Sequence, residues 1–268
     1  MIRDGGVVCG LGMYASGSTW VFNVLLKLAE TLAPDLPREN RFVSQSGDVG
    51  ELRPGRRLLL VKSHETDAKA EAALSAAAHL VVVSIRDPLD VVASAMLYQK
   101  RDFEESLDLA EKSALICARL AADKRALLLR YEAGFVDDPV TLDRLAARLG
   151  GALPVADRSR IFAATRRREI ERYIAELLRK PGVLIHRESG DLLDPATHWH
   201  TRHANRTGEV GRWKRTLSPA QVTAVERQLA GWMAANFYPT GRAACAGIDG
   251  RFAREDHQAA EHAADVGD

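Results

Sequence analysis

Cysteine is scarce in this 268-residue sequence, and an excess of charge of either sign is absent. The three cysteines, Cys9, Cys117 and Cys245, are scattered and form no CxxC pair. Their number and spacing argue against a disulfide framework and favour reduced thiols in a cytoplasm. With 37 Lys and Arg against 36 Asp and Glu, the net charge of +1 provides no global attraction to nucleic acid or to an anionic membrane. Any anion site must therefore be built locally.

Long apolar runs are also lacking. The longest aliphatic runs, Leu58–Val61 and Leu80–Val83, are too short to span a bilayer. The first residues lack the apolar stretch of a signal peptide. We therefore expect a soluble, cytoplasmic protein.

The composition is that of a globular protein, with 46% hydrophobic and 27% charged residues. A chain of this length can bury one large core. We expect a single domain over residues 1–250, in which 151–205 form a variable elaboration on the acceptor side. Residues 251–268 are polar and Ala-rich, which is typical of a flexible tail.

Apolar runs and helical patterns alternate along the chain. Four short apolar runs that end in polar residues predict buried strands: Val7–Met13, Leu58–His64, Leu80–Asp87 and Ala126–Glu132. Helices are predicted after Gly17, after Asp87-Pro88, after Asp138-Pro139 as far as Gly150, over the basic stretch 159–180, and after Ser218-Pro219 with Val222, Val225, Leu229 and Trp232 on one face. This alternation predicts an α/β fold, a three-layer P-loop-like arrangement with a mostly parallel central sheet flanked by helices. Ligands of such sheets bind beyond the carboxyl ends of the strands.

A glycine-rich turn over residues 12–19 (GMYASGST) follows the first strand with the spacing of a P-loop. Such a turn can wrap an anion, whose charge is stabilised by amides at the helix N-terminus. Ser18 stands where nucleoside triphosphatases have the lysine that reaches the β- and γ-phosphates, which weakens that interpretation. A dinucleotide fingerprint at residues 10–15 lacks the acidic residue expected about 20 positions later. A turn without any ligand remains an alternative.

Five segments, each at a strand end or in a loop, follow one another along the chain: 13–20 (MYASGSTW), 61–64 (VKSH), 86–94 (RDPLDVVAS), 129–132 (LRYE) and 206–214 (RTGEVGRWK). In this order they resemble motifs of the cytosolic-type sulfotransferases, which transfer a sulfuryl group from 3′-phosphoadenosine 5′-phosphosulfate (PAPS). The first resembles that family's Tyr-Pro-Lys-Ser-Gly-Thr-Thr-Trp loop. The resemblance spans about residues 6–236 and is poor over 151–205.

The resemblance implies a site for PAPS as donor substrate and no metal. It assigns the 5′-phosphate and sulfate to the loop residues Ser16, Gly17, Ser18 and Thr19, the adenine to Trp20 and Tyr131, and the 3′-phosphate to Arg86, Ser94, Arg206 and Gly208. Thr207 replaces a lysine of the family. A guanidinium suits phosphate because it makes charge-assisted, often bidentate contacts. Two structural alternatives stay open, in which Trp20 belongs to the core and Arg86 to a surface ion pair.

The same resemblance makes His64 the expected general base and Lys62 the cation that stabilises charge on the departing phosphate. A neutral imidazole can accept a hydroxyl proton near neutral pH. Lys62 lies two residues earlier, so strand alternation puts both side chains on one face. Glu65 is an alternative base, but alternation predicts that it points to the opposite face.

One position departs from the family pattern, because Ala15 stands where sulfotransferases carry a cation near the sulfate. A non-catalytic or weakened nucleotide-binding module is therefore an alternative function, and a P-loop kinase is another. The expected partner is a small-molecule acceptor with a hydroxyl group. The sequence specifies neither the acceptor nor the oligomeric state.

Three histidines, His198, His200 and His203, lie close together in the chain. The segment has no cysteine and no acidic residue at a regular ligand spacing, which argues against a metal site. A loop beside the acceptor pocket, or plain surface, is favoured instead. We expect residues 37–57 and 151–205 to select the acceptor, since loops near a rigid sheet carry specificity.

Overall fold

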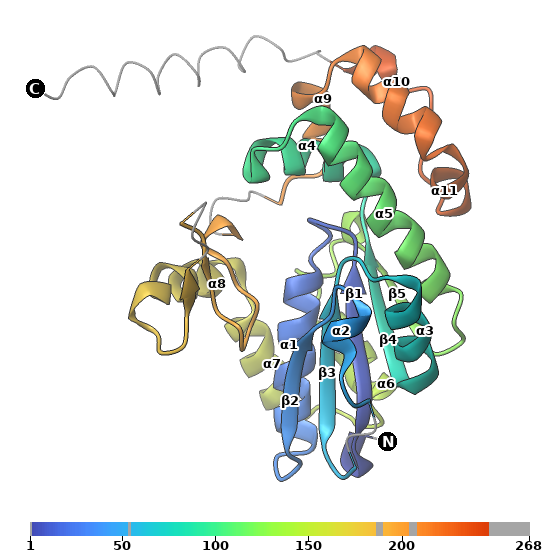
Figure 1. Ribbon diagram of the computed structural model, residues 1–268. Coiled ribbons are helices and arrows are strands. Elements are labelled where there is room, and N and C mark those ends of the chain that lie inside the picture. The colour runs from blue at the N-terminus through green and yellow to red at the C-terminus, as the bar shows by residue number, and fades with distance from the viewer. Residues whose placement is uncertain (1, 53–54, 186–189, 204–207, 247–268) are drawn as a thin grey trace, which may run out of the picture. The chain divides into compact units, whose positions relative to one another are not determined.

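The computed structural model describes residues 2–52, 55–185, 190–203 and 208–246 (Figure 1). The chain forms two compact units. The first contains residues 1–86 and 112–207, and the second contains 87–111 and 208–268. The first unit holds the central sheet, and the described part of the second is helical. The predicted tail, 251–268, lies outside the described residues.

The sheet has five parallel strands in the order β2-β3-β1-β4-β5. The strands are β1 (Gly6–Gly12), β2 (Arg38–Phe42), β3 (Leu58–Ser63), β4 (Ala78–Ile85) and β5 (Ala126–Arg130). The α/β class and the four predicted strands are confirmed, but the prediction that all four are buried is wrong for β5, an edge strand in which only Leu129 is buried. Strand β2 was missed because its sequence, RENRF, has no apolar run and lies at the edge of the sheet, where half-exposed polar residues are tolerated.

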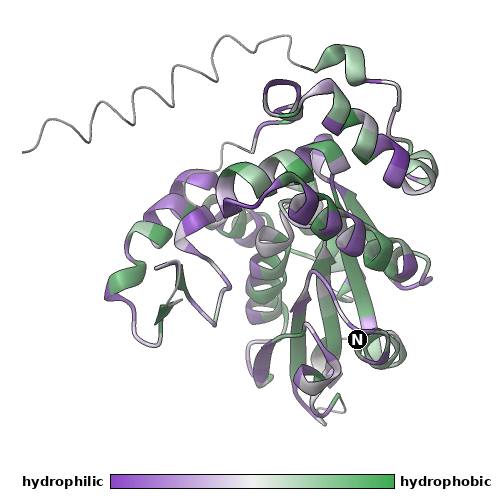
Figure 2. Ribbon diagram, turned by 45° about the horizontal axis from the view of Figure 1, so that its top comes forward, coloured by the Kyte–Doolittle hydropathy of each residue, from purple (hydrophilic) through white to green (hydrophobic). Residues whose placement is uncertain are grey.

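Helices cover the sheet in the first unit. They are α1 (Ser18–Leu32), α3 (Ala68–Ala77), α6 (Val140–Arg148) and α7 (Val155–Ala164). The helix α5 (Phe103–Ala121) is divided between the two units, and its residues from Lys112 onward belong to the first. Val8, Leu60 and Val82 share one core cluster with α1, α6 and α7. Their neighbours Val61 and Val83, which alternation turns to the other face, are equally buried. Both faces of the sheet are therefore covered at its inner strands, and β1, β3 and β4 are almost continuously apolar (Figure 2).

The basic stretch 159–180 is not the single helix predicted from its sequence. It is divided among α7, α8 (Arg167–Ala175) and a 3-10 turn at Leu177–Arg179. The break falls at Thr165, whose hydroxyl donates to the carbonyl of Ile161 (2.9 Å). Such a bond competes with the helical backbone and favours an end to the helix.

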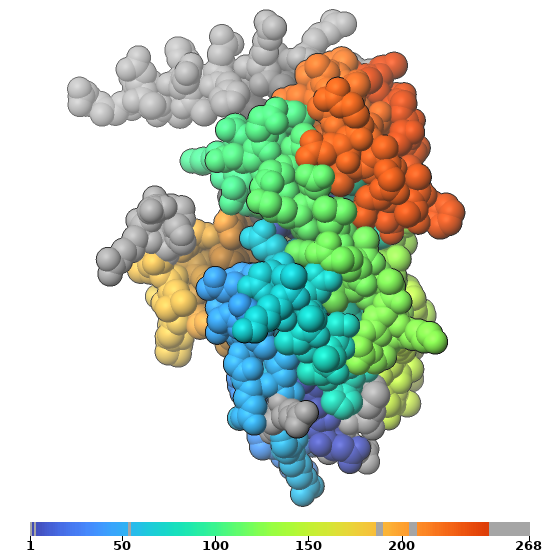
Figure 3. Space-filling view, turned by 45° about the vertical axis from the view of Figure 1, so that its right-hand side comes forward, coloured from blue at the N-terminus to red at the C-terminus, as the bar shows by residue number. Residues whose placement is uncertain are grey.

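Smaller elements complete the first unit. They are the 3-10 turns Ile2–Asp4, Tyr131–Ala133 and Thr201–His203, the short helix α2 (Ser46–Val49), and the antiparallel pair β6 (Leu184–Ile185) and β7 (Leu192–Leu193). The α2 and α3 segments lie on the surface of this unit, where Figure 3 shows them in blue and teal. Among the described residues, none of the helices has both the length and the apolar character needed to cross a membrane.

The second unit contains α4 (Pro88–Gln99), α9 (Trp213–Thr216), α10 (Pro219–Gln228), α11 (Ala230–Ala235) and a 3-10 turn at Ala243–Cys245. The helix predicted after Ser218 is broken after Gln228, so its apolar face is shared by two shorter helices. The buried carboxylate of Asp90 accepts hydrogen bonds from the amides of Gly211 (2.8 Å) and Trp213 (3.1 Å). These bonds attach the 208–213 loop to α4.

Candidate active site

The glycine-rich turn joins β1 to α1 at the carboxyl end of the sheet. A Cβ at Gly12 would lie 2.1 Å from the Ser84 hydroxyl and 2.8 Å from the Ser16 hydroxyl, so only glycine fits there. Gly17 has φ = 82°, in the left-handed region that glycine adopts without strain. The turn predicted from the sequence is therefore present. Glycine is required at position 12 because there is no space for a side chain, and at position 17 because the backbone is left-handed.

The N-terminus of α1 faces this turn. Its first intrahelical bond runs from the Val21 amide to the Gly17 carbonyl (3.0 Å), and no side chain of a described residue caps Gly17. The amides of Ser18, Thr19 and Trp20 precede that bond, so they remain available to an anion. The helix dipole adds positive potential at the same place.

Two of the predicted donor-binding side chains are engaged inside the protein. The Ser16 hydroxyl donates to the Met13 carbonyl (2.6 Å) and lies 2.8 Å from the Ser84 hydroxyl, so it shapes the turn. Trp20 is only 5% exposed, and its indole N–H donates to the Thr165 carbonyl (3.0 Å). Trp20 therefore belongs to the core, which is one of the two structural alternatives that the sequence left open. Its contact with adenine stays a prediction.

Lys62 and His64 meet beside the turn, as the sequence predicted, although His64 directly follows the last residue of β3. The His64 Nδ1 atom lies 2.9 Å from the Gly12 carbonyl oxygen, and Nε2 lies 3.1 Å from the Lys62 ammonium. Because a carbonyl only accepts, Nδ1 must carry the proton, which leaves the Nε2 lone pair to accept from Lys62. The backbone of the turn therefore fixes His64 in the tautomer required of a base at Nε2.

Tyr14, in the turn, covers one face of His64. The two rings are stacked, with 4.4 Å between centroids and 16° between planes. The Tyr14 hydroxyl donates to the Glu65 carboxylate (3.3 Å). The expectation that Glu65 points away from the site is therefore wrong, because β3 ends at Ser63 and alternation does not extend to Glu65.

Arg86 follows β4 and lies against the turn. Its guanidinium donates to the Ala15 carbonyl (3.0 Å) and sits 4.4 Å from the centroid of the Tyr131 ring. Arg86 is only 6% exposed, and the Tyr131 ring lies within van der Waals distance of a Cβ placed at Gly17. The turn, a cation and an aromatic face thus come together in the first unit, which suits a nucleotide phosphate and its base.

The remaining predicted donor-binding residues lie elsewhere. Ser94 is buried on α4, and Gly208 has φ = 68°; both belong to the second unit. Arg206 and Thr207 lie outside the described residues. The roles of these four residues stay predictions.

The aromatic side chain of Phe42 lies beside His64. Phe42 ends β2, is 40% exposed, and has its ring centroid 6.4 Å from that of His64 and 5.3 Å from the Lys62 ammonium. The same ring lies 5.7 Å, centroid to centroid, from the imidazole of His198. Phe42 lies within the 37–57 segment expected to select the acceptor, but no signal marked this residue itself, because it ends a polar edge strand.

The histidines of the 198–203 segment are not equivalent. His198 is 7% exposed, and burial lowers its pKa from near 6.5 to about 3, with the positive charge of Lys62 as a second cause. His200 is held by Asp191 (2.9 Å), nine residues earlier, and burial lowers its pKa to about 4. In the parts of the chain that the structure describes, no group of three or more His, Cys, Asp or Glu is arranged to hold a metal ion.

The buried His198 predicts a loss of stability in acid. The unfolded chain takes up this proton below about pH 6.5, whereas the folded one does so only near pH 3, so stability falls as the pH drops below 6.5. Between pH 7 and pH 5 we expect the wild type to lose about 2 kcal/mol more unfolding free energy than His198→Phe. Urea unfolding of both proteins at the two pH values measures the difference. Equal losses would contradict the burial of a neutral His198.

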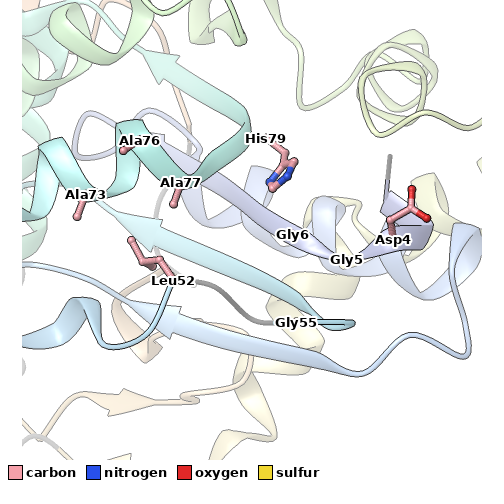
Figure 4. Close-up of a pocket in the computed structure, with 9 residues that line it drawn as sticks. All are labelled: Asp4, Gly5, Gly6, Leu52, Gly55, Ala73, Ala76, Ala77 and His79. Atoms are coloured by element: carbon pink, nitrogen blue, oxygen red, sulfur yellow. The ribbon is translucent and has the colours of Figure 1, made fainter.

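A cavity of about 470 Å³ lies at the other end of the sheet, among the amino ends of the strands (Figure 4). Gly6 at the start of β1, His79 near the start of β4, and Asp4 contribute to its lining. Because ligands of parallel α/β sheets bind beyond the carboxyl ends of the strands, the turn and His64 make the better candidate site.

Comparisons with known proteins bear on the fold. No family model matches the sequence, and no curated protein matches it. A mouse sulfotransferase in complex with 3′-phosphoadenosine 5′-phosphate (PAP) has a similar structure, with a TM-score of 0.56, 16% identity, and coverage of 86% of this chain and 85% of that one. The chain has the sulfotransferase fold.

Retinol dehydratase, solved with retinol and PAP and again with androsterone and PAP, shares this fold. The two structures give TM-scores of 0.56 and 0.57 at 16% identity, and each match covers 85% of this chain. They cover 81% and 80% of the dehydratase chain. The likeness confirms the sulfotransferase fold class expected from the five sequence segments.

Proposed function

We propose that this protein is a sulfotransferase that moves a sulfuryl group from PAPS to a hydroxyl group of a small molecule. The observation that carries the proposal is the meeting of the glycine-rich turn, Lys62 and His64 at the carboxyl ends of β1 and β3, with 2.9 Å and 3.1 Å hydrogen bonds. The structural neighbours bind PAP, which is PAPS without its sulfuryl group. A hydroxyl acceptor matches a base that is a neutral imidazole.

In the proposed reaction His64 Nε2 takes the proton of the acceptor hydroxyl as its oxygen attacks sulfur. The new S–O bond forms while the bond from sulfur to the bridging oxygen breaks, and the electron pair stays with the phosphate of PAP. The Gly12 carbonyl keeps the Nδ1 proton in place and stabilises the imidazolium that results. The proton that Nε2 has accepted is later released to solvent.

Lys62 has two partners in this scheme. In the structure its ammonium donates to His64 Nε2, and it is only 3% exposed. A donor in the turn brings negative charge, which attracts the ammonium toward the bridging oxygen and releases Nε2 to the acceptor. Lys62 thus stabilises the negative charge on the bridging oxygen. Its movement toward that oxygen also means that His64 Nε2 becomes available only when PAPS is bound.

The amides at the start of α1 are the proposed ligands of the 5′-phosphate, and Arg86 is the proposed ligand of the 3′-phosphate. Tyr131, against which Arg86 lies, is the proposed neighbour of adenine. The resemblance also assigns Ser94 and Gly208 of the second unit to the 3′-phosphate. These assignments predict that PAP binds more tightly than nucleotides without a 3′-phosphate.

Calorimetric titration with PAP, with ATP and NAD as controls, tests the proposal. We expect PAP to bind at least about tenfold more tightly than ATP or NAD, because only PAP offers a 3′-phosphate to Arg86. An acceptor screen with PAPS should then give sulfated products without added metal. Preferential binding of ATP would instead favour a P-loop kinase.

Ala15 favours a second candidate function, a nucleotide-binding module with little or no catalysis. It stands in the turn at φ = 57°, and its carbonyl accepts from Arg86. The resemblance places a cation here, and its loss removes one source of transition-state stabilisation. Binding of PAP without transfer to any acceptor of a broad screen would support the module.

Ala15→Arg is expected to raise turnover by about tenfold, which is part of the roughly 10²–10³-fold (about 2.7–4 kcal/mol) that one preorganised charge-stabilising group typically contributes. The left-handed backbone at this position already carries a side chain, so the substitution adds little strain. Initial rates with saturating PAPS measure the effect. Ala15→Met, of similar length and no charge, is the control. A rate that rises equally in both variants, or in neither, contradicts the role of charge.

A further inference from the structure

His198 carries a buried polar atom that no described residue satisfies. Its Nε2 is shielded from solvent and has no hydrogen-bond partner in the described part of the chain. Buried polar groups in proteins are almost always paired, and an unpaired one costs free energy. A partner other than the described residues is the physical expectation for this atom, and a ligand is one such partner.

The backbone of His198 is also unusual. Its φ of 57° lies in the left-handed region, which a residue with a side chain adopts only at a cost. The His198 amide donates to the Asp194 carbonyl (2.7 Å), which closes the turn. The strain is therefore imposed by the loop, and it points the imidazole inward between Phe22 (4.9 Å) and Phe42 (5.7 Å).

Three polar contacts hold the 194–199 loop in position. The Asn23 amide group, on α1, donates to the Thr197 carbonyl (2.8 Å), and the Asn40 amide group, on β2, donates to the Ala196 carbonyl (2.9 Å). Inside the loop, the Asp194 carboxylate accepts from the Thr197 hydroxyl (2.8 Å). A loop anchored to both α1 and β2 can present one side chain reproducibly, which a binding residue requires.

The ring of Phe42 places His198 next to the candidate active site. It contacts the imidazoles of His64 and His198, and the Lys62 ammonium lies over it. The charge of Lys62 acts on His198 as well. The unpaired Nε2 and the proposed base therefore belong to two imidazoles that lie near the same partly exposed aromatic ring.

We propose that His198 is an acceptor-binding residue, and that the acceptor carries a second hydrogen-bonding oxygen besides the hydroxyl that receives the sulfuryl group. The inference rests on the proposed function. The body of the acceptor lies against Phe42 and its reacting hydroxyl at His64. Its second oxygen reaches His198 Nε2 when the partly exposed Phe42 ring moves aside to uncover that buried atom. Because the imidazole is neutral near pH 7, it recognises a hydroxyl or a carbonyl and provides no charge for a carboxylate.

Matched acceptors test this inference. The probes are 2-naphthol, with one hydroxyl, and 2,3- and 2,7-dihydroxynaphthalene, with a second hydroxyl at two spacings. In the wild type we expect kcat/KM for at least one diol to exceed that for 2-naphthol by about tenfold or more, beyond the statistical factor of about two, because a buried polar group discriminates against a ligand that leaves it unpaired. His198→Phe keeps a ring but removes Nε2, and the ratio should fall to about two.

His198→Gln, which returns a polar atom near the Nε2 position, should restore part of the preference. His79→Phe at the amino end of the sheet is the matched control and should keep the wild-type ratio. PAP affinity of each variant, measured by calorimetry, should stay unchanged. Absence of PAP binding in the wild type overturns the proposed function and this inference together. Three results would overturn this inference alone, each with PAP binding intact. They are the absence of a preference for a diol, the absence of turnover with every probe, and a preference for a diol that His198→Phe retains.

Discussion

Replacing Arg86 with alanine is expected to weaken PAP binding by about 100-fold, which corresponds to about 2.7 kcal/mol. Arg86 is almost fully buried, donates to the Ala15 carbonyl of the turn and lies on Tyr131. A guanidinium held in this way loses little conformational freedom when it binds phosphate. Its contacts with the phosphate therefore contribute almost entirely to the binding free energy. Calorimetric titration with PAP measures the loss.

A second ligand makes this experiment specific for the 3′-phosphate. Wild type should prefer PAP to 5′-AMP, and Arg86→Ala should lose that preference while binding 5′-AMP nearly as before. Arg86→Lys, which keeps the charge but not the planar fork, should fall between. Arg119→Ala is the control, because Arg119 is paired with Glu71 on the surface and is half-exposed. A preference for PAP that survives in Arg86→Ala would assign the 3′-phosphate to other residues.

Replacing His64 with asparagine is expected to lower turnover by about 10²–10⁴-fold, the usual contribution of a positioned general base. The asparagine amide can still donate to the Gly12 carbonyl in the place of Nδ1, so the turn keeps this contact. The Nε2 lone pair is lost. PAP affinity should change by no more than about twofold, because the substitution removes no proposed donor ligand.

His79→Asn is the matched control for that variant. The Nδ1 of His79 accepts from the Val7 amide (3.2 Å), and an asparagine oxygen can accept in its place. His79 lies near the amino end of β4, away from the turn, so turnover should stay at the wild-type rate. If His64→Asn retains more than about a tenth of wild-type turnover, then His64 is not the base. Glu65, which Tyr14 holds beside the site, would become the first alternative.

Local signals predicted most of the fold. The apolar runs of β1, β3, β4 and β5 and the glycine-rich turn lie in the positions expected from the sequence. Burial restricts the residues of β1, β3 and β4, and left-handed backbone restricts those of the turn. The prediction of a long basic helix over 159–180 was wrong because a side-chain hydrogen bond at Thr165, which periodicity does not report, ends the helix.

The sequence by itself determined the α/β class, the glycine-rich turn and the pair formed by Lys62 and His64, because each depends on residues close together in the chain. Only the tertiary structure brought Phe42 and His198 together beside His64. Those residues lie on a polar edge strand and in a distant loop, joined by contacts such as that of Asn40 with Ala196 across 156 positions. Hydrophobic periodicity describes how one segment faces the core, and it contains no information about which distant segment packs against it.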